Sequence, residues 1–158
     1  MIEIQKVLDS DIEVLRSAAI SAFLDDERYK PENALPGGPP GHDQFEEHVR
    51  WIRKHDYFKC VFHGNIIGGC IVKKHPSHYE LYGIFLRSNF IGKGIGSEFL
   101  NGVMKMYPDR SPWLLETPNY SKRNHRFYEH NGFTVSLKTN LYPNLGYGFI
   151  IYQKPASK

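Results

Sequence analysis

The sequence predicts a mixed α/β domain in which one parallel pair of strands lies among antiparallel strands. Hydrophobic periodicity indicates the order strand, helix, helix, three strands, helix, strand, helix and two strands. A glycine-rich turn after Leu86 connects an apolar strand directly to a helix, and Gly64-Asn65 separates two apolar runs as in a hairpin. With 158 residues, the chain is expected to form a single domain over residues 1–158.

The first half of the chain should contain one strand, two helices and three further strands. Residues 10–13, Ser-Asp-Ile-Glu, form a capping-box pattern that starts the first helix after a strand at 2–7. The second helix is expected to begin at Asp43 and to bury Phe45, Val49 and Ile52. Proline and glycine make residues 29–42 a loop, and the three strands are expected at 57–63, 66–73 and 79–86.

The second half should contain two helices and three strands. After the glycine turn, Ile95, Phe99, Val103 and Met106 recur at helical spacing, and Tyr107-Pro108 ends that helix. A strand is expected at 113–117 and a short helix at 121–131, which Gly132 ends. The last two strands are expected at 133–137 and 148–153.

Composition argues against several classes of function. The net charge is +3 and the basic residues are scattered, which does not fit a nucleic-acid-binding surface. No apolar run approaches the roughly 20 residues of a membrane span, so we expect a cytoplasmic protein without membrane contact. Cys60 and Cys70 are expected to be reduced core residues, and His75 with His78 fits a polar turn better than a metal site.

The glycine-rich turn has the properties of an anion-binding site. Gly92, Gly94 and Gly96 allow close approach of a ligand to the backbone, and the helix that follows presents unpaired N–H groups. The spacing fits neither G-x-G-x-x-G, whose last position would be Ser97, nor a Walker loop, because Gly94 follows Lys93. The alternative is that these glycines only form a tight turn.

A second segment is more specific. Residues 113–117, Trp-Leu-Leu-Glu-Thr, precede residues 124–133, Asn-His-Arg-Phe-Tyr-Glu-His-Asn-Gly-Phe. The glycine turn fits the pattern [QR]-x-x-G-x-[GA], with Ile91 in place of Gln or Arg and with Gly94 and Gly96 in the two glycine positions. This pattern, the second segment and the element order together resemble those of the GNAT acetyltransferase superfamily. The resemblance implies a mostly antiparallel sheet of about seven strands with a splayed parallel pair, flanked by about four helices. It also allows a homodimer.

The resemblance implies that the cofactor is acetyl-coenzyme A. Backbone groups of Ile84, Phe85 and Leu86 would pair with the pantetheine arm. Amides of the glycine turn would hold the pyrophosphate, namely those of Gly92, Lys93, Gly94, Ile95, Gly96 and Ser97. Asn124 would supply a polar contact that many members make from the position of Ser121, while Lys122 and Arg123 either reach the 3′-phosphate or are ordinary exposed charges.

The resemblance also implies the catalytic groups. Tyr128, a phenol with an ordinary pKa of about 10, would protonate the departing thiolate. Glu116, at the end of a strand, is the preferred base, although a structural role or a water molecule as base is equally consistent with its position. Glu80 and Tyr82 share a strand face and form a rival base site.

The acceptor is expected to be the primary amine of a small molecule or of a peptide N-terminus. Its pocket would be walled by the 29–42 loop and by the turn near residue 143, with Tyr29, His42, Asp43 and Tyr142 as candidate contacts. The alternatives are a catalytically degenerate coenzyme A-binding module, transfer to a hydroxyl group and transfer of a longer acyl chain.

Overall fold

A computed structural model describes residues 1–107 and 111–156 of the chain. The described strands are β1 (Ile2–Lys6), β2 (Asp56–Phe62), β3 (Asn65–Lys74), β4 (Tyr79–Leu86), β5 (Trp113–Pro118), β6 (Thr134–Lys138) and β7 (Phe149–Lys154). The described α-helices are α1 (Ile12–Asp26), α2 (Phe45–Lys54), α3 (Ile95–Met104) and α4 (Lys122–His130). This order confirms the one predicted from periodicity; Pro108, predicted to end α3, lies outside the described residues.

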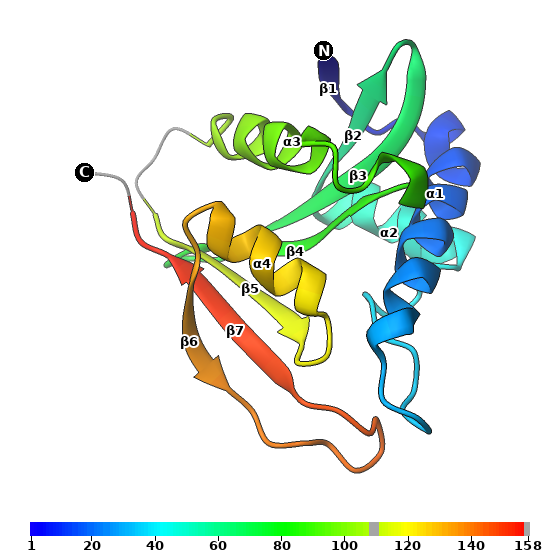
Figure 1. Cartoon of the computed structure of the whole chain (residues 1–158). Coiled ribbons are helices and arrows are strands. Elements are labelled where there is room, and N and C mark those ends of the chain that lie inside the picture. The colour runs from blue at the N-terminus through cyan, green and yellow to red at the C-terminus, as the bar shows by residue number, and fades with distance from the viewer. Residues whose placement is uncertain (108–110, 157–158) are drawn as a thin grey trace.

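The seven strands form one mixed sheet in the order β1-β2-β3-β4-β5-β7-β6. All neighbouring strands are antiparallel except β4 and β5, which are parallel. These two pair only at their beginnings, where Tyr79 lies opposite Trp113 and Glu80 opposite Leu114. Beyond that point the strands diverge (Figure 1), which confirms the predicted splayed pair and opens the sheet toward their carboxyl ends.

Two hydrophobic clusters lie on opposite faces of the sheet, because successive side chains of a strand alternate between its faces. On one face, α3 and α4 pack against a cluster that contains Val72 and Leu81. On the other, α1 and α2 pack against a cluster that contains Ile71, with Tyr82 at its margin. In Figure 1, α3 and α4 accordingly lie in front of the sheet, while α2 lies behind it and α1 runs down its right-hand side.

The start of α1 differs from the predicted capping box. The helix begins at Ile12 after a short 3₁₀ turn at Asp9–Asp11. The carboxylate of Asp11 accepts a hydrogen bond of 2.8 Å from the backbone N–H of Leu8. Asp11 also accepts one from Lys59 Nζ at 2.6 Å, so a tertiary ion pair determines where its side chain points.

Helix α2 also differs, since it begins at Phe45 and buries His48 and Trp51. The predicted stripe of Phe45, Val49 and Ile52 is wrong, because Phe45 is exposed and the other two are half-buried. Both ring nitrogens of His48 have hydrogen-bond partners, which makes a buried histidine tolerable. An apolar-pattern rule assigns histidine to the polar side and therefore selects the wrong face.

The hairpin between β2 and β3 turns one residue earlier than predicted. Phe62 pairs with Asn65, and the two residues between them, His63 and Gly64, have φ of 49° and 78°. Positive φ at both positions is the geometry of a type I′ turn.

No described helix is long and apolar enough to cross a membrane.

Candidate functional site

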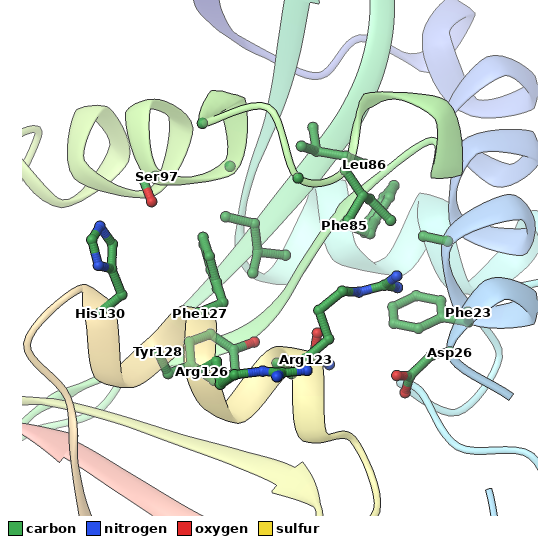
Figure 2. Close-up of a pocket in the computed structure, with 17 residues that line it drawn as sticks. Phe23, Asp26, Phe85, Leu86, Ser97, Arg123, Arg126, Phe127, Tyr128 and His130 are labelled. Carbon is green, nitrogen blue, oxygen red and sulfur yellow. The ribbon is translucent and has the colours of Figure 1, made fainter. Parts of the chain in front are cut away.

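A cavity of about 410 Å³ lies where the splayed strands leave the sheet open (Figure 2). Its walls come from α1, β4, the turn before α3, and α4. The lining residues are Ala22, Phe23, Asp26, Ile84, Phe85, Leu86, Ile91, Gly92, Gly94, Gly96, Ser97, Arg123, Asn124, Arg126, Phe127, Tyr128 and His130.

The turn before α3 supplies one end of the cavity. Gly92 and Gly94 have φ of 82° and 81°, and no atom lies within 4 Å of where a Cβ would stand on either residue. This left-handed backbone favours glycine, and the open space leaves the loop accessible to a ligand. The first amides of α3 have no acceptor within the helix, so this end of the cavity suits an anion.

Strand β4 supplies the floor, with Ile84, Phe85 and Leu86 lining the cavity. On one side β4 pairs with β3 along its length, up to Leu86 opposite Gly68. On the other side its pairing with β5 stops at Glu80, so in the described structure the later part of this edge has no paired strand. Such an edge presents main-chain donors and acceptors to an extended ligand.

Helix α4 supplies the opposite wall through Asn124, Phe127 and Tyr128. Tyr128 is buried, and this burial raises the pKa of its hydroxyl above the ordinary value. The phenol therefore keeps its proton at neutral and mildly alkaline pH, and Figure 2 shows the ring at the cavity.

An amide network holds α3 and α4 together beside the cavity. Asn131, at the end of α4, donates from Nδ2 to Ser97 Oγ at 3.1 Å and accepts at Oδ1 from Asn101 Nδ2 at 3.1 Å. A Cβ on Gly96 would stand 3.1 Å from the ring of Phe127, so the small residue permits close packing of the two helices. These contacts fix the start of α3 relative to Tyr128 on α4.

The remaining predicted cofactor residues, Lys93 and Ile95, lie at the glycine turn but do not line the cavity. Ile95 is buried in the core on the α3 and α4 side, and Lys93 is exposed.

The candidate bases Glu116, Glu80 and Tyr82 also lie outside the cavity lining. Partial desolvation, and secondly the charge of Glu80, raises the pKa of the exposed Glu116 carboxyl. Glu80 itself contacts His75 Nε2 at 2.8 Å. Tyr82 is half-buried beneath Lys73, whose Nζ lies 3.6 Å from the ring centroid, and burial raises its pKa.

The predicted acceptor residues are spread over two loops at the open end of the sheet. The ring of His42 lies 4.7 Å from that of Phe23, a residue of the cavity wall. Tyr29 faces the guanidinium of Arg123 at 5.7 Å, whereas Tyr142 is exposed and packs on Phe149. The structure therefore connects Tyr29 and His42 to the cavity through its wall residues and leaves Tyr142 outside it.

The two loops are in direct contact with each other. The backbone N–H of Leu35 donates to the carbonyl of Leu145 at 2.8 Å. A Cβ on Gly146 would come within 2.9 Å of Ala34, so only glycine fits this crossing without displacement. The two loops therefore pack against each other at these residues.

Five lining residues with polar or aromatic side chains were missed by the sequence reasoning, namely Phe23, Asp26, Arg126, Phe127 and His130. A signal existed for Asp26, which follows Ala22 by four residues on the buried stripe of α1. A charged residue on an apolar stripe indicates a special role. Among the described residues, no group of three or more His, Cys, Asp or Glu is arranged to hold a metal ion.

The model of the acetyltransferase (GNAT) family matches residues 19–133, more than half of the chain. The chain belongs to the GNAT acetyltransferase family. The matched range begins within α1 and includes the glycine turn, β4, β5 and α4. No curated protein matches the chain significantly.

Several solved GNAT structures share the fold. The PaiA N-acetyltransferase of Thermoplasma acidophilum, in complex with coenzyme A, has 18% identity and a TM-score of 0.76, covering 98% of this chain and 99% of its own. The ribosomal-protein-S18-alanine N-acetyltransferase of Escherichia coli has 15% identity and a TM-score of 0.76, covering 100% and 96%. An acetyltransferase of Thermus thermophilus has 14% identity and a TM-score of 0.76, covering 98% and 97%. At such identities the likeness establishes the GNAT fold.

Proposed function

We propose that this GNAT protein is an acetyl-coenzyme A-dependent N-acetyltransferase that acts by direct transfer in a ternary complex. Its acceptor is the primary amine of a small molecule or of a peptide N-terminus. One observation carries the proposal: a protonated phenol, an unpaired strand edge and a helix N-terminus line one cavity. A neighbour of the same fold is a complex with coenzyme A, which supports the choice of cofactor.

The cavity residues suit the parts of coenzyme A. Amides of residues 92–97 would bind the pyrophosphate, with the open space at Gly92 and Gly94 as the cradle. Main-chain groups of Ile84, Phe85 and Leu86 would pair with the amides of the pantetheine arm. Arg123 Nη2 is already paired with Asp25 Oδ2 at 2.6 Å, so the exposed Arg126 is the better placed cation for the nucleotide.

When bound, acetyl-coenzyme A supplies an activated acetyl thioester. Tyr128 Oη would donate its proton to the sulfur as the carbon–sulfur bond breaks. Glu116 is our preferred proton acceptor for the amine, because its raised pKa brings it nearer to neutral pH than an ordinary carboxylate. Since Glu116 does not line the cavity, a water molecule would relay the proton, with Glu80 and Tyr82 as the rival site.

Two measurements test the proposal. A thermal shift should show selective stabilisation by acetyl-coenzyme A over ATP and NAD, of about 2.7 kcal/mol at 100 times the dissociation constant. Release of free thiol should then be followed with 1,4-diaminobutane, alanine amide and tyramine as acceptors. Turnover with at least one amine is expected, whereas cofactor binding without turnover would favour a binding module, and turnover only with alcohols would favour O-transfer.

Variants separate the candidate groups. Tyr128→Phe and Glu116→Gln should each lower the turnover number by about 10²–10⁴-fold if they move protons. Glu80→Gln and Tyr82→Phe serve as comparisons on the neighbouring strand, and a larger loss there than at Glu116 would transfer the base role to that pair.

A further inference from the structure

The hydroxyl of Ser97, on the first turn of α3, lies at the side of the cavity where α3 faces α4. Ser97 is half-buried and lines the cavity. Figure 2 shows its oxygen directed from α3 toward α4. Within the described structure, Ser97 Oγ forms one hydrogen bond, which joins it to Asn131 Nδ2 at 3.1 Å. The orientation of the Asn131 amide therefore controls what this hydroxyl can do.

The side-chain amide of Asn131 has one favourable orientation. Its Nδ2 lies 2.9 Å from the carbonyl oxygen of Phe127, and a carbonyl can only accept, so the nitrogen faces that group. Its Oδ1 accepts a hydrogen bond of 3.1 Å from Asn101 Nδ2. Exchanging the nitrogen and the oxygen would place Oδ1 against the carbonyl and would bring two NH2 groups together.

The amide of Asn101 is oriented by the same argument. Its Nδ2 donates to the carbonyl oxygen of Ser97 at 2.9 Å as well as to Asn131 Oδ1. Each NH2 group has two hydrogens, so both hydrogens of Asn101 and both of Asn131 are engaged. Since Asn131 is only 8% exposed, these bonds also satisfy the requirement that a buried amide has partners.

The direction of the bond between Asn131 and Ser97 follows from this network. Nδ2 of an amide donates and does not accept, so Ser97 Oγ is the acceptor and keeps its own hydrogen for another partner. A hydroxyl that already accepts a hydrogen bond is polarised and becomes a stronger donor. Because Ser97 lines the cavity, a ligand there can provide the acceptor.

The acceptor that fits this hydroxyl is an anionic oxygen. Gly92, Gly94 and Gly96 line the cavity together with Ser97, and the first amides of α3 have no acceptor within the helix. Main-chain donors and the Ser97 hydroxyl therefore belong to one short segment. A negatively charged oxygen bound at this segment can accept hydrogen bonds from both kinds of donor.

We propose that Asn131 is a positioning residue for the cofactor, because its amide commits the Ser97 hydroxyl to donate to an anionic oxygen at the start of α3. The inference rests on the proposed function, in which this oxygen belongs to the pyrophosphate of coenzyme A. Ser97 binds the ligand, and Asn131 acts through Ser97. Asn131→Asp would reverse the arrangement, because a carboxylate only accepts and would take the hydroxyl hydrogen for itself.

A double-mutant cycle on the dissociation constant of coenzyme A, measured by calorimetry, tests the proposal. Ser97→Ala should weaken binding about ten- to hundredfold, the loss of one hydrogen bond to a charged group. Asn131→Leu has nearly the shape of asparagine but no donor, and it should weaken binding about three- to tenfold, because the hydroxyl can then turn to a carbonyl of the preceding turn. The double variant should bind as Ser97→Ala does, since no hydroxyl is left to orient.

A purely structural Asn131 gives a different result in the same cycle. Its hydrogen bonds to Asn101 and Phe127 do not involve the Ser97 hydroxyl, so Asn131→Leu would then weaken binding by the same factor with or without that hydroxyl. Equal factors, or an unchanged affinity of Asn131→Leu alone, would overturn the proposal. If Asn131→Leu does not fold, Asn131→Asp replaces it, because the repulsion of its charge acts in both arms and cancels in the cycle.

Asn65→Leu is the matched control for loss of an amide. Asn65 Nδ2 donates to the carbonyl oxygen of His63 at 3.3 Å in the β2–β3 hairpin, and the residue does not line the cavity. This variant should change the dissociation constant of coenzyme A less than twofold. A loss as large as that of Asn131→Leu would show a general effect of destabilisation and contradict the positioning role.

Inorganic pyrophosphate separates failure of this inference from failure of the proposed function. If coenzyme A does not bind, but pyrophosphate raises the melting temperature of the wild type more than that of Ser97→Ala and Asn131→Leu, the positioning role stands and the cofactor assignment fails. If coenzyme A binds the wild type and both variants equally, the positioning role fails and the proposed function stands. If neither ligand binds the wild type, both fail.

Discussion

His48 Nε2 donates a hydrogen bond of 2.7 Å to the backbone oxygen of His42. A carbonyl can only accept, so this nitrogen carries the ring proton, and Nδ1 accepts from the hydroxyl of Tyr57 at 2.8 Å. The neutral ring thereby connects the loop that borders the cavity to α2 and β2. Burial lowers the pKa of His48 below its ordinary value.

Acid should therefore weaken the folded protein through His48. Between the unfolded pKa of about 6.5 and the lower folded pKa, the unfolded chain binds a proton at this site and the folded chain does not. The free energy of unfolding should fall more steeply from pH 7 to 5 in the wild type than in His48→Gln, measured by urea titration. His55, whose pKa burial also lowers, contributes equally to both proteins. Parallel curves would contradict the prediction.

Gly94→Ala and Gly64→Ala should lower the free energy of unfolding by similar amounts, but only Gly94→Ala should also weaken cofactor binding. Both glycines are left-handed, with φ of 81° and 78°, and both have open space at the Cβ position. Each substitution should cost about 1–2 kcal/mol of unfolding free energy. Only Gly94→Ala should weaken binding of coenzyme A in calorimetry, because Gly64 lies in the distant hairpin. Equal affinities for the two variants would remove the glycine turn from the binding site.

Loss of the Tyr128 hydroxyl should slow turnover without weakening cofactor binding. Tyr128→Phe keeps the ring that packs against Phe133 and Tyr152, so the core is preserved. We expect turnover to fall by about 10²–10⁴-fold. The control is Tyr152→Phe, because that hydroxyl donates to Glu129 Oε2 at 2.7 Å and does not line the cavity. Similar small losses in both variants would exclude Tyr128 as the proton donor.

The two cysteines should not react with thiol reagents in the folded protein. Cys60 and Cys70 are free and buried, and burial raises the pKa of Cys60 to about 12 and that of Cys70 further. Since the thiolate is the reactive form, Ellman's reagent should detect no thiol until denaturant exposes both. Rapid labelling of the native protein would contradict their placement in the core. The thiol-release assay should then report coenzyme A alone.

Two local features differ from the sequence prediction, namely the β2–β3 hairpin and the buried face of α2. The hairpin shifted by one residue, so that His63 and Gly64, rather than Gly64 and Asn65, form the turn with positive φ. Helix α2 buries His48 because the Tyr57 hydroxyl and the His42 carbonyl form hydrogen bonds with its two ring nitrogens. At His48, tertiary hydrogen bonds outweighed the polar preference of the residue.

The linear order of helices and strands, the glycine turn before α3 and the Tyr128 segment follow from the sequence by itself. They depend on periodicity, on backbone freedom at single residues and on short motifs, all of which are local properties. Only the tertiary structure brought Asp26 into the cavity, through a hydrogen bond to Ser121 across 95 residues of chain. The physical reason is that solvation and pairing of a carboxylate depend on which distant elements surround it, and no spacing along the chain encodes that environment.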